Sequence, residues 1–361
     1  MMTTSSKFDE NSVAFPARRV DPGTANPSAG KSRKTSPVFI IGCHRSGTAL
    51  LYDSLLSAGG FPLYHASPYV HTALLRICGE PSVRRNRERM LQLWLRSKGF
   101  RRTGLAPDDL RSKILDECRS GGDFLRIVMG ELAERAGVQR WAVRDCDNIF
   151  YMPAIKREIP DALFVHVVRD GRDAALSMKK QHGAPPRLWA RDRDLLVWAL
   201  LWQWTVRKGR RHGQQFSADY IEVGYEDLVE HPEKTLRVLG EFLDHDLDYE
   251  RIQRSAMGHV VSPNTVWKEE SGAGNFNPVN RWKAKLSAAE IEMLEEAIGD
   301  CLREFSYPLS TERDTSARLE ITDRLMCSFY PGYFDTKLFL QSKTLIGRLA
   351  KGTRLELAPS V

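Results

Sequence analysis

Two features are scarce in this sequence: long apolar runs and patterned cysteines. No run of about 18 consecutive apolar residues occurs in the 361 residues, so we expect no membrane-spanning helix. The first residues lack a basic start followed by an apolar stretch, which argues against a secretory leader. The six cysteines form no CxxC pair and no ligand-like spacing; they are Cys43, Cys78, Cys118, Cys146, Cys301 and Cys327. We therefore expect reduced thiols, a cytoplasmic location and no metal site.

The charge is basic but not gathered in one part of the chain. Lys and Arg number 53 against 46 Asp and Glu, which gives a formal net charge of +7. This balance favours anionic partners. A nucleic-acid-binding face would need clustered basic residues with interleaved aromatic residues. The sequence has no such cluster, so we expect no nucleic-acid partner.

Apolar runs and helical periodicities predict an α/β fold. Residues 1–36 are rich in Ser, Thr, Pro and charge without an apolar period, which predicts a disordered arm. We expect one domain over 37–308 and a partly helical extension over 309–361. The alternation of strands and helices predicts a central parallel sheet flanked by helices. The strands are expected at 38–41, 141–143, 163–168 and 220–223; the helices are expected at 48–58, 84–97, 108–119, 123–136, 190–211, 233–243, 288–304 and near 335–349, with one more ending near Lys180.

A glycine-rich turn follows the first predicted strand. Gly42 and Gly47 are five residues apart, and Thr48 follows directly. This outline is typical of a loop whose backbone amides and following helix N-terminus surround a phosphate. The motif GxxxxGK[ST] has a lysine before the hydroxyl residue, whereas here the cation of the loop is Arg45. The difference argues against ATP or GTP chemistry, in which that lysine reaches the β- and γ-phosphates.

A second polar turn follows the strand predicted at 163–168. Arg169 leaves this strand, and Ser177 lies eight residues later on the next helix. A guanidinium fork and a hydroxyl in this arrangement can converge on one phosphate. Pairing between Asp170 and Arg172 in a surface turn would explain the charges. It would not explain why the chain has two phosphate-type loops in this order.

The two loops together resemble those of sulfotransferases that use 3′-phosphoadenylyl sulfate (PAPS). IGCHRSGTALL is similar to the family's 5′-phosphosulfate loop, usually PKSGTT or PRSGTT, and VVRDGRDAALS is similar to its 3′-phosphate loop. The resemblance implies the family's P-loop nucleotide-kinase-like fold and transfer of a sulfuryl group from PAPS to a hydroxyl or amine, without a metal. It implies that the donor is bound by Arg45, Ser46, Gly47, Thr48, Ala49, Arg169 and Ser177.

Two later segments resemble further parts of this family. Tyr225 begins a YEDL segment whose tyrosine often contacts adenine, although a tyrosine packed at a strand end gives the same pattern. The stretch 275–283 is similar to the loop that closes over the nucleotide. The resemblance implies that Arg281 and Lys283 reach the 3′-phosphate while Trp282 packs. A solvated basic turn is the alternative.

Sulfuryl transfer by in-line displacement needs a cation at the leaving phosphate and an acceptor for the proton. Arg45 is predicted at the leaving side, with His44 as an assistant. Many relatives carry an acidic residue in a segment like YRAETH, but this chain has Ser67 at that position. The easiest assignment of the general base is therefore missing.

Three other residues are candidates for the general base. His65 ranks first and His71 third, because a histidine accepts a proton near neutral pH. Asp145 ranks second, in a segment that resembles the family's WGxKxPRN, although a pair with Arg144 would weaken it as a base.

The acceptor and the activity itself have alternatives. Region 61–135 mixes aromatic residues with arginines, which suits a small-molecule, glycan or lipid acceptor without choosing among them. A small-molecule kinase would need the missing lysine after Gly47. A catalytically inactive nucleotide-binding protein is the other alternative, since the acidic residue is absent at Ser67.

Overall fold

The computed structural model describes residues 32–182, 194–255, 278–310, 319–344 and 355. Its sheet has the order β2-β1-β3-β4, and every pair is parallel. The strands are β1 (Val38–Gly42), β2 (Ala142–Arg144), β3 (Leu163–Val168) and β4 (Tyr220–Gly224). The predicted parallel sheet is confirmed, and all four strands lie at the positions expected from the sequence.

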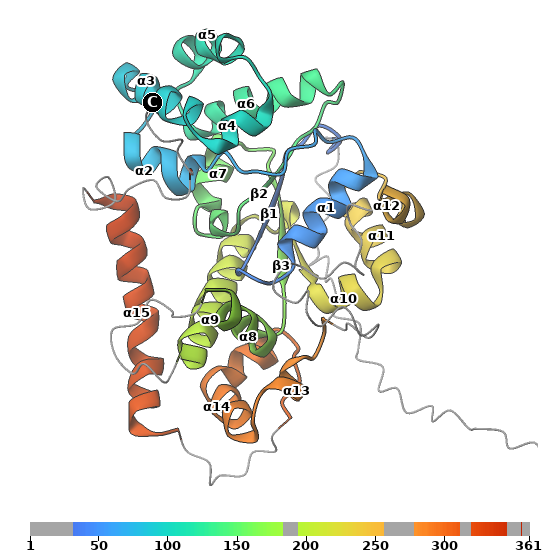
Figure 1. Cartoon of the computed structure of the whole chain (residues 1–361), viewed down its shortest axis with the longest axis vertical. Helices are drawn as coiled ribbons and strands as arrows, with labels where there is room; N and C mark the ends of the chain where they lie inside the picture. The colour runs from blue at the N-terminus through green and yellow to red at the C-terminus, as the bar shows by residue number, and fades with distance from the viewer. Residues whose placement is uncertain (1–31, 183–193, 256–277, 311–318, 345–354, 356–361) are drawn as a thin grey trace, which may run out of the picture.

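Helices follow and precede these strands along the chain (Figure 1). Before β2 they are α1 (Thr48–Ala58), the π-helical turn η1 (Val70–Leu74), α2 (Leu75–Cys78), α3 (Arg84–Leu95), α4 (Lys98–Thr103), α5 (Pro107–Glu117) and α6 (Gly121–Arg135). Between β2 and β4 they are the 3₁₀ turn η2 (Cys146–Phe150), α7 (Met152–Glu158), α8 (Gly171–His182), α9 (Asp194–Gly213) and the 3₁₀ turn η3 (Gln214–Asp219). After β4 they are α10 (Tyr225–Glu230), α11 (Pro232–Leu243), α12 (Tyr249–Ser255), α13 (Trp282–Lys285), α14 (Ala288–Glu304) and α15 (Ile321–Lys343).

Successive residues of β1 enter different cores because side chains alternate across a strand. Val38 and Ile40 pack with α1, α11 and α12 on one face of the sheet. Phe39 and Ile41 pack with α3, α5, α6 and α7 on the other face. All four side chains are fully buried. The sheet is therefore covered on both faces, as the continuous apolar runs predict.

A third core lies at the carboxyl ends of the strands. Cys43 and Val168, which directly follow or end a strand, pack there with α8, α9, α14 and α15. Figure 1 shows α15 running alongside α9, with its end near α2. The helix expected near 335–349 is thus corrected: it begins at Ile321 and ends at Lys343, and it contains Pro331. A proline removes one helical hydrogen bond, and packing against α9 supports the helix across it.

The predicted N-terminal arm is described in the structure only at its end. Residues 1–31 of the expected arm lie outside the described residues. Arg33, inside that arm, donates hydrogen bonds to the carbonyl oxygens of Phe242 and Ala218 at 2.7 Å each. Arg140 donates to the Ser36 carbonyl oxygen at 2.6 Å. Residues 33–36 are therefore attached to the folded body.

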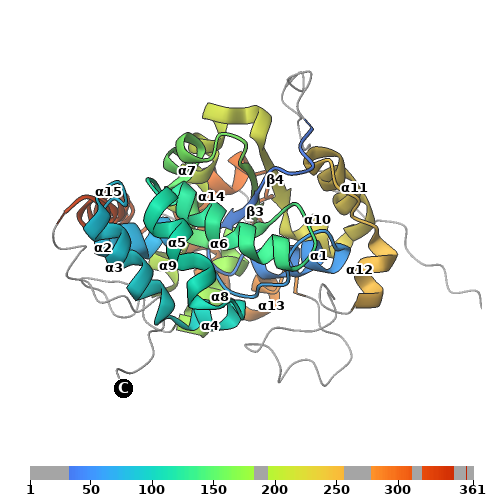
Figure 2. The same cartoon turned by 90° about the horizontal axis from the view of Figure 1, so that it is seen from above.

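The helix bounds otherwise follow the sequence periodicity closely. The capping box expected before α14 is present: Ser287 Oγ accepts a hydrogen bond from the Glu290 amide, and the Glu290 carboxylate accepts one from the Ser287 amide. Figure 2, from above, shows α2 to α6 grouped on one side of the sheet. Within the described ranges, no helix combines the length and apolar character needed to cross a membrane.

Candidate active site

The loop between β1 and α1 has the backbone of an anion-binding turn. Arg45 has φ 69° and Gly47 has φ 90°, both left-handed, so the chain curls before Thr48 and Ala49 begin α1. A Cβ atom added to Gly47 would lie 2.1 Å from the Tyr225 ring. Only glycine fits there, because the position needs a positive φ and the ring occupies the space of a side chain. The turn therefore leads directly into the N-terminus of α1, the end of a helix that favours an anion.

The two predicted phosphate loops meet in space. Arg45 Nε donates a hydrogen bond to Ser177 Oγ at 3.1 Å, and an Arg169 Nη atom donates to the Arg45 carbonyl oxygen at 3.1 Å. Ser46 Oγ is buried and has no hydrogen-bond partner among the described residues. Burial and the nearby Arg169 lower the pKa of Arg45. Two guanidinium groups and two hydroxyls therefore gather where an anion would offset the repulsion between the cations.

Arg169 is the centre of this contact. It donates a hydrogen bond to the Pro278 carbonyl oxygen at 2.7 Å, lies 4.6 Å from the centroid of the Tyr225 ring, and pairs with Asp173 at 3.6 Å. Burial raises the pKa of Asp173 to about 6. Tyr225 is thus packed between the two loops. Residues 275–277 of the predicted closing segment lie outside the described residues.

The described part of that segment is attached to the second loop through α8. The Trp282 amide donates to Asp173 Oδ1 at 2.9 Å, and the Arg172 guanidinium lies 3.7 Å from the Trp282 ring centroid. Arg281 is buried, whereas Lys283 is exposed and lies 5.6 Å from the same ring. Trp282 packs, as the resemblance implies.

Two of the three candidate bases are histidines with carboxylate partners. His65 Nδ1 lies 3.5 Å from Asp53 Oδ1, and more than half of its side chain is exposed. His71 is buried, and its Nε2 lies 3.1 Å from Glu158 Oε2. The Glu158 carboxylate also accepts the Gly122 amide at 2.7 Å. The contacts of His71 thus join η1 to α6 and α7.

The third candidate, Asp145, has a buried carboxylate with structural partners. It accepts the Thr72 hydroxyl at 2.8 Å and the Asp147 amide at 3.1 Å, so it caps the turn η2. These bonds hold β2 against η1.

A cluster of polar side chains that the sequence did not predict lies beside the phosphate loop. His44 Nε2 lies 3.3 Å from Asp147 Oδ1, and Cys146 Sγ lies 3.4 Å from Thr48 Oγ1. Burial opposes charge on His44, but the Cys146 sulfur and the Asp147 carboxylate outweigh burial and raise the pKa of His44. The sequence could have predicted this cluster, because residues that follow neighbouring parallel strands lie close together at the carboxyl ends of those strands.

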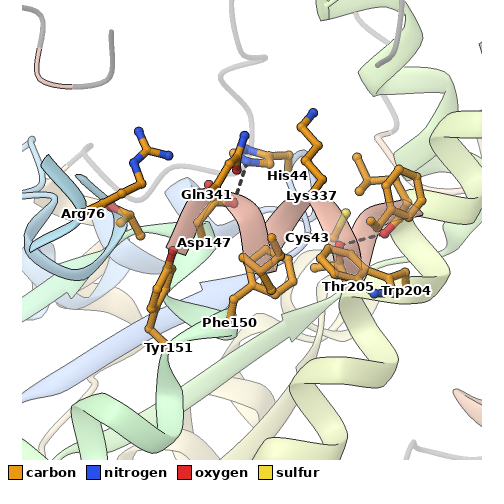
Figure 3. A pocket seen from close by; sticks show the side chains of 15 residues that line it. Cys43, His44, Arg76, Asp147, Phe150, Tyr151, Trp204, Thr205, Lys337 and Gln341 are labelled. Carbon is orange, nitrogen blue, oxygen red and sulfur yellow. Dashed lines mark hydrogen bonds and ion pairs between the residues drawn. The ribbon is translucent and has the colours of Figure 1, made fainter. Parts of the chain in front are cut away.

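His44 and Asp147 also line a cavity of about 180 Å³ (Figure 3). The cavity lies between the loop after β1, η2, α9 and α15. Aromatic side chains form much of its wall, and two cations, Arg76 and Lys337, lie along it. Its other lining residues are Gly42, Cys43, Thr72, Phe150, Tyr151, Leu201, Trp204, Thr205, Phe334, Leu338 and Gln341.

Among the described residues, no three His, Cys, Asp or Glu side chains are grouped so as to hold a metal ion. The groups that gather at the loops are instead guanidinium and hydroxyl donors, which suit an anion.

Comparison with known proteins identifies one family. The family model described as "Sulfotransferase family" matches residues 37–249. No curated protein matches the sequence.

Similar solved structures include two sulfotransferase domains and a retinol dehydratase. The sulfotransferase domain of the Synechococcus PCC 7002 olefin synthase is 18% identical, with coverage of 81% of this chain and 94% of that chain and a TM-score of 0.42. The sulfotransferase domain from the curacin biosynthetic pathway is 15% identical, with coverage of 75% and 98% and a TM-score of 0.48. A retinol dehydratase in complex with androsterone and inactive cofactor PAP is 16% identical, with coverage of 80% and 84% and a TM-score of 0.39. The TM-scores are below 0.5, so the family assignment rests on the family model.

Proposed function

The chain belongs to the sulfotransferase family, an enzyme family of the transferase class, and on this premise we propose that it moves a sulfuryl group from PAPS to a hydroxyl or amine of a small-molecule acceptor. One observation carries the choice of donor: Arg45, Arg169 and Ser177 meet, although two loops more than 120 residues apart supply them. A donor with phosphates at both its 5′ and 3′ positions needs such a pair of loops. A nucleotide with only a 5′-phosphate chain does not.

The donor groups fit this ligand by their chemistry. A serine hydroxyl has one donor and two acceptor positions, so Ser177 can accept from Arg45 and still donate to a phosphate oxygen. Ser46 brings a hydroxyl that lacks a partner among the described residues. The amides at the start of α1, with Thr48 and Ala49, suit the 5′ side. We assign the 3′-phosphate to Arg169 and Ser177.

The secondary nucleotide contacts are part of the same proposal. Tyr225 packs against Gly47 and Arg169, so its contact with adenine would be made by the edge of a ring that also fixes the loops. Trp282 holds the closing segment on Asp173. We assign Arg281 and Lys283 to the 3′-phosphate side only when that segment closes over the nucleotide.

The chemical step needs a cation for the leaving group and a proton acceptor. As the acceptor oxygen or nitrogen bonds to sulfur, the bond from sulfur to the 5′-phosphate oxygen breaks and negative charge grows on that phosphate. Arg45 and the N-terminus of α1 stabilise this charge. The acceptor meanwhile loses one proton, which must pass to a nearby base.

We assign that base to His44, in preference to His65, Asp145 and His71. Asp147 Oδ1 lies 3.3 Å from His44 Nε2, and an imidazole is a group that accepts a proton near neutral pH. His44 also lines the cavity beside the loop. The carboxylate of Asp145 holds η2, His71 is buried on Glu158, and His65 lies on Asp53 at the surface.

Thermal stabilisation tests the donor assignment. 3′,5′-Diphosphoadenosine should raise the melting temperature more than ADP or AMP at the same concentration, because a ligand that binds the native state more tightly stabilises it more. Ser177→Ala should reduce the gain from the diphosphonucleotide but not the gain from AMP. Equal gains from all three nucleotides would contradict the proposal, and the largest gain from ATP with magnesium would favour a kinase.

Steady-state kinetics test the base. His44→Ala should lower turnover by about 10²-fold or more with unchanged affinity for the diphosphonucleotide. Because the neutral imidazole is the active form and the pKa of His44 is raised, wild-type turnover should still increase with pH above 6.5. His65→Ala is the matched control. Loss of turnover in His65→Ala, with normal turnover in His44→Ala, would move the base to His65.

A further inference from the structure

The cavity beside His44 has walls from parts of the chain that are far apart in sequence. Phe150 comes from η2, Trp204 from α9 and Phe334 from α15. Their rings form a continuous surface: the Phe150 and Trp204 centroids are 4.6 Å apart, and those of Trp204 and Phe334 are 5.4 Å apart. Figure 3 shows Phe150 between Tyr151 and Trp204. A flat apolar body therefore finds a matching wall here.

The position of α15 on this cavity is fixed by polar contacts with α9. Trp204 Nε1 donates to Asp335 Oδ1 at 3.2 Å, and Lys208 pairs with the same carboxylate. Trp204 is thus oriented by a residue of the C-terminal extension. The extension is a wall of the cavity through Phe334, Leu338 and other residues.

The charges along the cavity are mainly positive. Arg76, from α2, and Lys337, from α15, both line it. Arg76 Nε is shielded from solvent and has no hydrogen-bond partner among the described residues. The acidic residue of the lining, Asp147, pairs with His44. An anionic group on a ligand would therefore meet positive charge along this wall of the cavity.

The cavity is large enough to hold one ring. A cavity of about 150 Å³ accommodates a benzene ring, and this one measures about 180 Å³. A single ring with short substituents fits inside it, and longer parts of an acceptor would lie outside, because the cavity is open to solvent on one side.

We propose that this cavity is the acceptor site and that the acceptor is a small hydroxyaromatic anion, with its hydroxyl toward His44, its ring on Phe150 and Trp204, and its anionic group on Arg76. The proposal rests on the sulfotransferase function proposed above and adds the acceptor class. It also gives the C-terminal helix α15 a part in acceptor binding.

Binding to the protein loaded with 3′,5′-diphosphoadenosine tests the acceptor class. The probes are 4-hydroxyphenylacetate and its uncharged analogue 4-hydroxyphenylacetamide, measured by calorimetry. The acid should bind about tenfold more tightly or better, which corresponds to one charge-assisted hydrogen bond. Arg76→Met should remove this preference by weakening the acid alone. Arg85→Met, at an exposed arginine on α3, is the control and should change nothing.

A second variant tests the place of the site. Leu338→Trp adds bulk at a lining residue of α15 and should abolish acid binding, whereas Leu340→Trp on the exposed face of the same helix should not. If the diphosphonucleotide binds normally but the acid and amide bind equally, or Arg76→Met keeps the preference, the acceptor assignment is wrong and the donor assignment stands. If the diphosphonucleotide itself fails to bind, the proposed function is wrong, and this inference falls with it.

Discussion

Gly47→Ala should damage the protein more than the cost of a strained backbone alone. An alanine at a left-handed position costs about 1–2 kcal/mol, and Gly47 has φ 90°. The new Cβ would also lie 2.1 Å from the buried Tyr225 ring, so the ring must leave its place. Truncation of a buried aromatic residue costs about 3–5 kcal/mol. Part of that cost should appear here, and we expect a total loss of about 3 kcal/mol or more in the free energy of unfolding.

Gly137→Ala is the matched control, because Gly137 has φ 67° and nothing lies within 4 Å of an added Cβ. It should lose only about 1 kcal/mol. Urea unfolding measures both losses, and a double-mutant cycle with Tyr225→Ala isolates the clash, since contacting residues show a coupling energy. Gly47→Ala should also weaken binding of 3′,5′-diphosphoadenosine. Equal stability of the Gly47 and Gly137 variants, with no coupling to Tyr225, would refute the described packing of the loop.

Three further perturbations have definite outcomes. Arg172 is buried and pairs with Asp170 at 2.7 Å and with Glu295, so Arg172→Met should leave two buried carboxylates uncompensated and cost about 3–5 kcal/mol in urea unfolding; a loss below 1 kcal/mol would contradict this. Burial raises the pKa of Asp173 from 3.8 to about 6, so the native state binds this proton more tightly than the unfolded state. The stability gained from this proton is fully present below pH 4 and is lost as pH rises through 6. Asp173→Asn should therefore make the free energy of unfolding depend less on pH between 4 and 6. An unchanged pH dependence in this variant would contradict the raised pKa of Asp173. We propose that Arg45 and the N-terminus of α1 supply the positive charge at the leaving phosphate, so EDTA should leave sulfuryl transfer intact, and strict dependence on magnesium would favour the kinase alternative.

The sheet and its loops were predictable because they depend on local patterns. Continuous apolar runs mark β1 and β3, and the glycines of the first loop mark its turn. The parallel sheet then brings both phosphate loops to one edge, since each follows the carboxyl end of a strand. The contact between Arg45 and Ser177 is a direct consequence of that topology.

The proposed base His44 and the cavity were harder to predict because they depend on packing between distant segments. From the sequence, His71 was a candidate only because it is a histidine. In the fold its Nε2 contacts the Glu158 carboxylate, which also accepts the Gly122 amide. His44 meets Asp147 only after β1 and β2 pair. The place of α15 against α9 depends on aromatic contacts and on Asp335, for which no local pattern exists.

We propose that a donor phosphorylated at both its 5′ and 3′ positions binds across the two loops. Calorimetry with 3′,5′-diphosphoadenosine and 5′-AMP tests it most directly. The 3′-phosphate should gain charge-assisted hydrogen bonds from Arg169 and Ser177, each contributing about 1.5–3 kcal/mol. The diphosphonucleotide should therefore bind at least about a hundredfold more tightly than AMP. Ser177→Ala should reduce the ratio of these two affinities. Comparable affinities of the two nucleotides for the wild-type protein would contradict the account.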